Sequence, residues 1–471
     1  MLSATALDTT SLFDRVAFSD HPTVAAAVSG GSDSTALLVL LKQYLEQAAS
    51  SVRLVAVTVD HALRAGSADE ARQVAAFCAR IGVEHVTRTW TDAKPSTGLA
   101  AAARDARYRL LAETAGELGA TLIFLGHTAD DQAETVAMRA QRGEGRGLAS
   151  MAPATLLDGR YWLMRPLLGV RREALRDGLR AKNIGWIDDP SNDSRDYERV
   201  RTRRGLEKSQ DIDALLAQAD AAARRRIELG RCAAALIAAH ASLAAPGLVR
   251  LDAEFLPPPL TPPLKGEGGV TVAVSPSPLR GGVRGGGSLI AKSETPSAPL
   301  PSDADTARYA LRLLLAVMGG RSDLPSEPAT GALLAKLAAG TRRAVLSRAV
   351  VDVRAGSIWL HRELRNLPEL NATADDDAWD GRFRMTRTAP AGQDEQPSYP
   401  ENPEAPAALL RAAAATMPGI SASSLRAVPL AAPWARFLPS FDIAPATAIL
   451  RLIGGDLPPP LPYAGHSEDR A

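Results

Sequence analysis

A loop of glycines and serines follows the first strand-like segment of the chain, residues 23–29, and could hold phosphate groups. Its residues are Ser29, Gly30, Gly31, Ser32, Asp33 and Ser34. Glycine lets a ligand approach the backbone closely, the serines offer hydroxyls, and the free amides of the helix expected next would point at a bound anion. Because Asp33 would repel a bare phosphate, a bound Mg²⁺ is the natural mediator. The alternative is an ordinary helix-capping turn without a ligand.

A second carboxylate for such a cation is expected at the end of a later strand. The stretch GHTADDQAET overlaps the end of the apolar segment 121–127 and carries His127, Asp130 and Asp131. In an open α/β sheet, ligand groups gather at the carboxyl ends of the strands. Asp33 and Asp131 could therefore hold one hard cation between them and offset the charge of a phosphate leaving group. The alternative is that the Asp130/Asp131 pair only complements the dipole of the following helix.

Other strand-end groups are candidates for binding a nucleotide. Asp60 and His61 lie in VDHALR, at the end of the apolar segment 53–60, and would line a nucleotide pocket. His127 could contact phosphate or transfer a proton. Each also has an ordinary structural alternative. Asp60 could cap its strand, and a lone histidine at a strand end often serves only as a hydrogen-bond donor.

A basic stretch follows these motifs. Residues 139–207 hold fifteen Lys and Arg against ten Asp and Glu, a surplus of five positive charges. Such a stripe is typical of surfaces that bind RNA phosphates, although a solvated face with ion pairs would have the same composition. An acidic turn at Asp188 and Asp189 would suit an ammonium group, or is simply solvated. The candidate contacts for RNA or a second substrate are Arg142, Arg165, Arg171, Asp188, Asn192, Arg199, Arg201 and Arg203.

The loop resembles the signature S-G-G-x-D-S of the PP-loop ATP pyrophosphatase family, whose members cleave ATP between the α and β phosphates. Further motifs narrow the resemblance to the tRNA(Ile)-lysidine synthetases: VDHALR, GHTADDQAET, RGEGRGLASM, MRPLLGVRREAL and WIDDPSNDSRDYERVRTR. The resemblance extends from about Thr23 to Arg203.

This resemblance implies a ligase that uses ATP and Mg²⁺. Enzymes of that family join free L-lysine to C2 of the wobble cytidine of a CAU-anticodon isoleucine tRNA. The reaction passes through an adenylated cytidine and releases pyrophosphate and AMP. With the resemblance, Asp33, His127 and Asp131 become the predicted catalytic residues.

Other activities on the same fold agree less well with the residues present. A tRNA thiolase carries sulfur on closely placed cysteines, whereas this chain has only Cys78 and Cys232 and no C-x-x-C pair. A glutamine-coupled amide synthetase would need a glutaminase domain headed by a cysteine, which is not recognisable. A non-catalytic RNA-binding module would have no use for the loop or for Asp131. Thiolation, or another PP-loop modification of tRNA, stays the main alternative.

Alternating strand and helix patterns position these residues. Apolar runs predict strands at 23–29, 53–60, 85–90 and 121–127, and helical patterns are found around 37–45 and over 67–82, 99–118 and 129–142. This alternation predicts βαβ units and an α/β fold with a doubly wound parallel sheet, followed by helical and α+β regions.

Four regions are expected along the chain. They are a PP-loop ATP-binding catalytic domain (1–205), a helical segment for substrate or tRNA (206–256), a Pro/Gly-rich flexible insertion (257–304) and a C-terminal α+β region that could bind tRNA (305–471). Residues 257–301 contain ten Pro and eight Gly, a composition typical of linkers. Order is expected to resume near Asp305, with helices at 307–319 and 330–339 and a strand-like stretch at 348–364.

Composition sets the broad class of protein. The 471 residues are 46% hydrophobic and carry 54 Lys and Arg against 53 Asp and Glu, so the chain can bury a core but has no overall charge for a polyanion. Two cysteines exclude a disulfide framework and a four-thiolate metal site. Without a signal peptide or an apolar run long enough for a membrane span, we expect a cytoplasmic protein. A homodimer is one possible assembly, and the sequence leaves the oligomeric state open.

Overall fold

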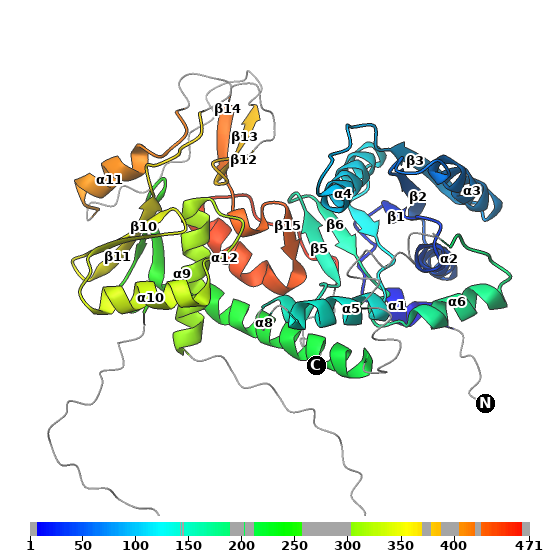
Figure 1. Ribbon diagram of the computed structural model, residues 1–471, viewed down its shortest axis with the longest axis horizontal. Coiled ribbons are helices and arrows are strands. Elements are labelled where there is room, and N and C mark those ends of the chain that lie inside the picture. The colour runs from blue at the N-terminus through cyan, green and yellow to red at the C-terminus, as the bar shows by residue number, and fades with distance from the viewer. Residues whose placement is uncertain are drawn as a thin grey trace, which may run out of the picture.

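The computed structural model describes residues 7–141, 143, 146–188, 202, 212–256, 303–369, 378–387, 405–419 and 425–463. Figure 1 shows two lobes joined by a long helix, α8 (Ile212–His240), which runs along the lower side of both. The N-terminal lobe is built on a mostly parallel sheet and the C-terminal lobe on a smaller antiparallel sheet. None of the described helices is long and apolar enough to cross a membrane.

Seven strands form the N-terminal sheet, in the order β15-β5-β6-β4-β1-β2-β3. Its parallel part consists of β1 (Thr23–Ala27), β2 (Arg53–Asp60), β3 (Glu84–Thr89), β4 (Leu122–Phe124) and β6 (Tyr161–Met164). At one end of the sheet the pairing is antiparallel: β5 (Ala154–Leu157) pairs antiparallel with β6, and the edge strand β15 (Phe437–Pro439) pairs antiparallel with β5. The predicted doubly wound parallel α/β sheet is therefore confirmed, with an antiparallel edge that the sequence patterns did not indicate.

Helices cover both faces of this sheet. They are α1 (Thr9–Phe13), α2 (Ser32–Gln47), α3 (Ser67–Arg80), α4 (Leu99–Leu118), α5 (Ala129–Ala140) and α6 (Arg172–Ala181). Side chains of β1 alternate between two apolar layers. Val24 and Ala26 pack in the layer that includes α2, and Ala25 and Ala27 in the layer that includes α4. Each face thus buries its own apolar layer, as the two-residue period of a strand requires.

Two strands end before the apolar runs that predicted them. β1 stops at Ala27 and β4 at Phe124, and the residues that follow turn out of the sheet at its carboxyl edge. β1 lies between β2 and β4, and the order of the strands reverses at the β1–β4 boundary. Such a switch point is where open α/β sheets bind ligands, so the fold places both predicted strand-end motifs at the expected position.

The second sheet has the order β7-β8-β11-β10-β9. Its strands are β7 (Ala241–Ala245), β8 (Leu248–Leu251), β9 (Arg343–Leu346), β10 (Ala349–Arg354) and β11 (Ser357–Arg362). The predicted boundaries between 206–256 and 305–471 therefore separate strands that share one sheet, since β8 pairs with β11. The predicted insertion lies outside the described residues as far as residue 302.

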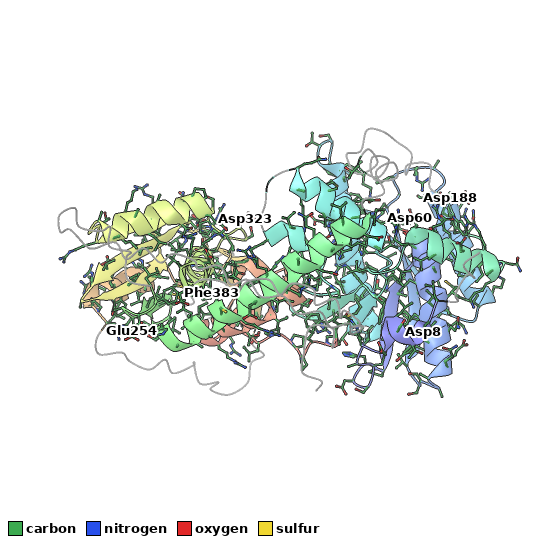
Figure 2. The ribbon with its side chains drawn as sticks, turned by 90° about the horizontal axis from the view of Figure 1, so that it is seen from below. Asp8, Asp60, Asp188, Glu254, Asp323 and Phe383 are labelled. Carbon is green, nitrogen blue, oxygen red and sulfur yellow. The ribbon has the colours of Figure 1, made fainter. Side chains whose placement is uncertain are left out.

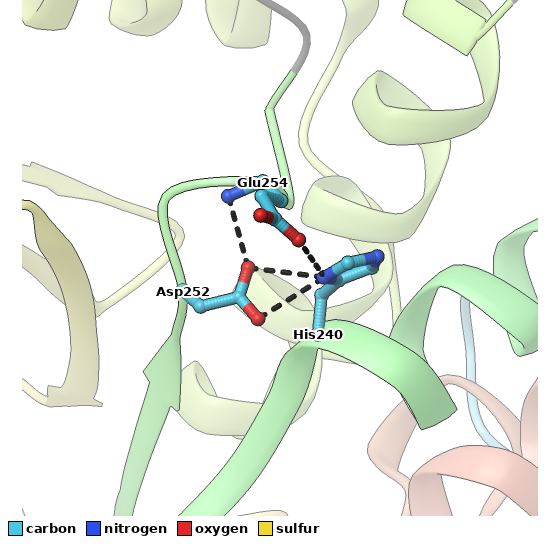
Figure 3. A group of neighbouring side chains, drawn as sticks. All are labelled: His240, Asp252 and Glu254. Atoms are coloured by element: carbon cyan, nitrogen blue, oxygen red, sulfur yellow. Dashed lines mark hydrogen bonds and ion pairs between the residues drawn. The ribbon is translucent and has the colours of Figure 1, made fainter.

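The remaining elements complete the C-terminal lobe. The helices are α9 (Asp303–Gly319), α10 (Glu327–Ala338), α11 (Ala407–Ala414) and α12 (Ile443–Ile453), with 3-10 turns η3 (Ala432–Trp434) and η4 (Ser440–Asp442). A further 3-10 turn, η1 (Arg146–Ala149), follows α5 in the N-terminal lobe. A small sheet contains β12 (Ala378–Trp379), β13 (Phe383–Arg387) and β14 (Leu425–Pro429). The end of α8 is tied to the turn after β8, because His240 Nδ1 lies 3.0 Å from Asp252 Oδ2 and 3.8 Å from Glu254 Oε2 (Figure 3).

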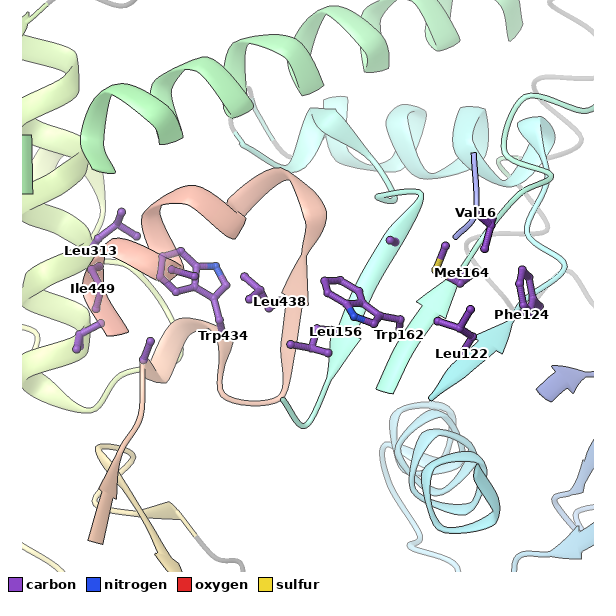
Figure 4. Packing of buried hydrophobic residues seen from close by; sticks show 14 of the residues in the cluster. Val16, Leu122, Phe124, Leu156, Trp162, Met164, Leu313, Trp434, Leu438 and Ile449 are labelled. Atoms are coloured by element: carbon purple, nitrogen blue, oxygen red, sulfur yellow. The ribbon is translucent and has the colours of Figure 1, made fainter. Parts of the chain in front are cut away.

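One apolar core extends through both lobes. Figure 4 follows it from Phe124 and Trp162 in the parallel sheet to Trp434 and Ile449 in the C-terminal lobe. The link is β15, in which Leu438 pairs with Leu156 of β5. Residues from the end of the chain thus complete the edge of the N-terminal sheet, so the two lobes share buried apolar surface.

Candidate active site

The loop between β1 and α2 has the conformation of an anion-binding turn. Gly30 has φ +88°, and Gly31 is the N-cap of α2. A Cβ at Gly30 would lie 2.7 Å from Ile187 Cδ1 and 2.9 Å from Val74 Cγ2, so only glycine fits there. The first turn of α2 begins directly after this loop and directs its free amides to the carboxyl edge of the sheet.

Serine hydroxyls hold the shape of the loop. Ser29 N donates to Ser34 Oγ (3.1 Å), and Ser34 Oγ donates to Gly31 O (3.1 Å). Ser32 Oγ donates to Asp33 Oδ1 (3.0 Å). Ser32 and Ser34 are buried, whereas Ser29 is exposed and is therefore the most accessible of the three predicted serines.

The structure brings Asp33 and Asp131 together on one guanidinium. Arg172 Nε donates to Asp33 Oδ2 (2.8 Å) and Arg172 Nη2 donates to Asp131 Oδ1 (3.0 Å), while Glu134 Oε1 lies 3.7 Å from Arg172 Nη1. Gly126 permits this approach, since a Cβ there would lie 3.0 Å from the carbonyl of Asp33. Three carboxylates thus converge on one cationic group beside the loop.

Arg172 and Glu134 were not singled out from the sequence. Burial opposes the charged form of Arg172, but the charges of Asp131 and Asp33 outweigh it and raise the pKa of the guanidinium above its ordinary value. The signal for Glu134 was its spacing of three from Asp131, which puts both side chains on one face of α5. Arg172 gave no comparable signal, because its partners are distant in sequence.

Asp131 also caps α5. Its Oδ2 accepts a hydrogen bond from Thr128 N (2.8 Å), and Thr128 Oγ1 accepts one from Asp131 N in a capping box. The alternative that Asp131 only stabilises the start of the helix therefore holds for Oδ2, whereas Oδ1 contacts Arg172. Asp130 makes different contacts, because its Oδ2 accepts from Arg172 N (2.7 Å) and its Oδ1 from the exposed Arg171 (3.4 Å).

Asp60 and His61 lie at the end of β2. Asp60 is buried and its Oδ1 accepts a hydrogen bond from Ala62 N (2.8 Å), which is the strand-capping alternative. His61 lies edge-on to the Trp90 ring, with ring centroids 6.2 Å apart. Burial and the charge of Arg107 lower the pKa of His61, so its imidazole is neutral at pH 7. Within the described residues, the buried Nδ1 of His61 has no hydrogen-bond partner.

Two further cations lie at this edge of the sheet and were missed in the sequence. Arg104 and Arg107 are three residues apart on α4, which places them on one face of the helix. The charge of Arg107 helps to lower the pKa of His61, and the charges of Arg104 and Arg107 help to lower the pKa of Arg165. Among the described residues neither arginine forms an ion pair, so both charges are available to an anion. Their R-x-x-R spacing was the signal that could have found them.

Arg165 is a structural residue, which corrects its prediction as an RNA contact. It lies just after β6 and is only 7% exposed. Its Nη1 donates to Ala152 O and to Thr155 Oγ1, both at 2.9 Å. Burial lowers the pKa of this guanidinium. A side chain that is held in the interior cannot reach a phosphate on the surface, and the composition of the basic stretch carried no information about burial.

The segment before Asp188 packs on the loop. Ile187 N donates to Gly30 O (2.9 Å), and exposed Asp188 accepts a hydrogen bond from Trp186 Nε1 (3.0 Å). In Figure 2, Asp60 and Asp188 lie on the same side of the N-terminal lobe. His127 is half-buried between β4 and α5. The other predicted contacts lie outside the described residues: Arg142, Asn192, Arg199, Arg201 and Arg203.

Comparison with known families agrees with this geometry. The family model of the PP-loop domain matches residues 4–210. The chain thus contains a PP-loop domain, and proteins of this class use ATP. In this domain the glycine loop with positive φ lies at the switch point of the parallel sheet, with carboxylates beside it.

Full-length relatives define the family more closely. The tRNA(Ile)-lysidine synthase of Mesorhizobium japonicum is 44% identical and covers 98% of this chain and 98% of its own. The corresponding proteins of Brucella anthropi and Brucella ovis are 40% and 39% identical and cover 79% and 80% of this chain and 76% and 79% of theirs. The chain therefore belongs to the tRNA(Ile)-lysidine synthase family, whose members are ATP-dependent ligases acting on tRNA.

Solved structures are more distant. The U34-tRNA thiolase NcsA from Methanococcus maripaludis is 18% identical, with a TM-score of 0.38 over 45% of this chain and 77% of its own. NAD+ synthetase from Burkholderia pseudomallei is 15% identical, with a TM-score of 0.30 over 46% of this chain and 90% of its own. Likenesses of this size add nothing to the assignment made from the relatives.

Proposed function

We propose that the protein joins free L-lysine to C2 of the wobble cytidine of a CAU-anticodon tRNA(Ile), and that the ATP-dependent step takes place beside Asp33 and Asp131. The observation that carries this proposal is the convergence of the two carboxylates on Arg172, at 2.8 and 3.0 Å, next to the glycine loop. These residues come from two neighbouring strand ends at the switch point, where a nucleotide is expected to bind.

Asp33 and Asp131 would hold Mg²⁺. Their donor set suits this ion, because Mg²⁺ prefers hard oxygen ligands and a third carboxylate, Glu134, lies on the same guanidinium. Arg172 balances only one of the three carboxylates that converge on it, so negative charge remains and a cation beside it is electrostatically favourable. When bound, Mg²⁺ would offset negative charge on the phosphates of ATP.

The loop and its surroundings would bind the rest of the nucleotide. Free amides at the start of α2 suit a phosphate, and Ser29 is exposed beside them. Arg104 and Arg107 add two charges that no described carboxylate neutralises, and His127 would contact phosphate from the end of β4. Asp60 and His61, at the end of β2, would line the nucleotide pocket.

The reaction would proceed in two steps. First the C2 oxygen of the cytidine bonds to the α-phosphorus of ATP, and the bond to pyrophosphate breaks. The lysine ammonium then loses a proton, its nitrogen bonds to C2, and the bond between C2 and the AMP oxygen breaks. The chain would act mainly by holding these groups in line and by stabilising charge. Asp188 would face the ammonium, and Arg142, Arg171, Arg199, Arg201 and Arg203 would contact RNA phosphates, with Asn192 nearby.

The division of labour along the chain is part of the proposal. Residues 1–205 would form the catalytic domain, and 206–256 and 305–471 would extend the surface that binds tRNA. The shared core and α8 support this arrangement, because they join the C-terminal lobe firmly to the parallel sheet.

Release of pyrophosphate tests the proposed site. The purified protein is incubated with ATP, Mg²⁺, unmodified CAU-anticodon tRNA(Ile) and radiolabelled lysine. We expect pyrophosphate and labelled tRNA from the wild type, and a loss on the order of 100-fold or more in Asp131→Asn, since this variant removes one carboxylate ligand of the Mg²⁺ that would offset the charge of the leaving group.

Asp130→Asn is the matched control. It removes a neighbouring carboxylate from the same turn of α5, and we expect its rate to stay within about threefold of the wild type. Equal losses in both variants would assign the effect to the helix end and contradict the proposed role of Asp131. Pyrophosphate release without lysine in the RNA would keep the adenylation step and reject lysine as the nucleophile.

A further inference from the structure

A buried carboxylate joins the C-terminal lobe to the segment that follows α5. Asp442, at the start of α12, is only 1% exposed. It accepts hydrogen bonds from Arg146 Nη2 (2.7 Å), Arg226 Nε (2.8 Å) and Trp434 Nε1 (3.0 Å). Three separate parts of the chain, η1, α8 and η3, therefore meet on one side chain.

The segment 146–151 is tied equally firmly on its other side, to α5. Gln132 Oε1 accepts a hydrogen bond from Met151 N (2.8 Å), and Gln132 Nε2 donates to Met151 O (3.0 Å). Arg139 donates to the carbonyl of Gly147. Gln132 directly follows Asp131, so hydrogen bonds and short stretches of backbone connect the proposed ATP site to Asp442.

At this junction two guanidinium groups, of Arg146 and Arg226, face the one carboxylate of Asp442. Burial alone would raise the pKa of Asp442, but the hydrogen bond and charge of Arg226, with the charge of Arg146, hold that pKa below its ordinary value. The carboxylate is therefore ionised at neutral pH and shared between a guanidinium of the N-terminal lobe and one of α8. Arg146 also stacks over the Tyr309 ring of α9, 4.8 Å from its centroid.

We propose that Asp442 is a positioning residue for the tRNA reaction: by holding Arg146, it fixes segment 146–151 beside α5, so that the C-terminal lobe sets the geometry of the catalytic edge that tRNA must reach. This inference rests on the proposed function and goes beyond it, because it assigns a role in that reaction to a residue more than 300 positions from Asp131. Asp442 contacts no expected substrate and acts only through Arg146.

The experiment compares Asp442→Asn with Asp352→Asn. Asp352 is a suitable control, because it is also a buried aspartate of the C-terminal lobe (3% exposed) that pairs with an arginine. Its Oδ1 accepts a hydrogen bond from Arg354 Nε (2.7 Å). Its contacts stay within the second sheet. Four quantities are measured for each variant: thermal stability, the Kd for ATP, KM for tRNA, and the rate of tryptic cleavage after Arg146 without any substrate.

We expect Asp442→Asn to raise KM for tRNA about tenfold and to speed tryptic cleavage after Arg146, with the ATP Kd changed by less than about twofold. Asp352→Asn should lower stability without either effect. If both variants change KM and cleavage in proportion to their loss of stability, the role of Asp442 is only structural and the inference is wrong. Since cleavage and ATP binding are read without turnover, failure of the proposed reaction would leave these two readouts intact.

Arg146→Met provides a second test should Asp442→Asn fail to fold. Arg146 is partly exposed, and its removal leaves Asp442 paired with Arg226. We expect the same rise in KM for tRNA. The double variant should then have a KM for tRNA no higher than that of Asp442→Asn alone, because both changes break the contact between Arg146 and Asp442. Additive effects would mean that the two residues act independently and would overturn the inference.

Discussion

Gly30 and Gly31 are neighbours in the loop, yet the structure gives them opposite tolerance for a side chain. We expect Gly30→Ala to lower the free energy of unfolding by about 1–3 kcal/mol and to abolish ATP binding, because φ is +88° and the new methyl group would meet Ile187 and Val74. Thermal denaturation and ATP titration measure both effects.

Gly31→Ala is the matched control for the fold. The backbone of Gly31 has φ −67°, and the nearest atom to an added Cβ is Ser29 Oγ at 3.7 Å. Its stability should stay within about 0.5 kcal/mol of the wild type. A Gly31→Ala protein as unstable as Gly30→Ala would show that the loop tolerates neither change and that positive φ is not the cause.

At this scale, side chains that follow strand ends could be predicted and their distant partners could not. Asp33 and Asp131 were identified because parallel strands bring their carboxyl ends to one edge of the sheet. Arg172 escaped notice because its contact with Asp33 spans 139 positions. Arg165 was misassigned for a related reason, since a run of arginines does not reveal which of them is buried.

Among the elements, local pattern predicted the parallel strands and their helices, while long-range pairing decided the rest. The predicted helix at 99–118 matches α4 residue for residue, and the strand at 53–60 matches β2. β15 has only three residues, and its partner β5 lies far away in the sequence, so no local pattern could assign it to the sheet. The same holds for β8 and β11, whose pairing crosses the predicted insertion.

Replacing residues 257–302 with a flexible linker tests that predicted insertion. The two described flanks pack in one core, since Phe255 and Leu311 are both fully buried there. A Gly/Ser linker of about 15 residues can span up to ~50 Å. We expect thermal stability to stay close to that of the wild type, because loop length affects stability only weakly. The rate of lysine incorporation should remain within about twofold of the wild-type rate.

Phe255→Ala is the control for this experiment, because it alters the flank and keeps the insertion. It should lower the free energy of unfolding by about 3–5 kcal/mol, as expected for a fully buried aromatic side chain. A deletion protein that folds with wild-type stability but incorporates no lysine would show that the segment takes part in the reaction.

For the whole molecule, histidine burial predicts how stability depends on pH. Burial lowers the pKa of His21, His61, His85 and His361, which come from both lobes. The unfolded chain, with histidine pKa values near 6.5, therefore binds more protons than the folded chain as the pH falls below that value. Stability should be constant above about pH 7.5 and decrease by on the order of 1 kcal/mol or more by pH 5.5. Urea denaturation followed by tryptophan fluorescence measures this change.

His361→Gln separates this cause from general acid destabilisation. His361 is 2% exposed on β11, where burial is the largest cause of its lowered pKa and Asp352 only partly opposes it. Arg343 lowers the pKa further, and a carbonyl contact with Arg362 raises it. Glutamine can keep a hydrogen bond but takes up no proton, so the variant should lose less stability between pH 7.5 and 5.5 than the wild type. Because the lobes share one core, the whole chain should unfold in a single transition whose pH dependence sums the histidines of both lobes. An unchanged pH dependence in the variant would assign the acid sensitivity to other groups.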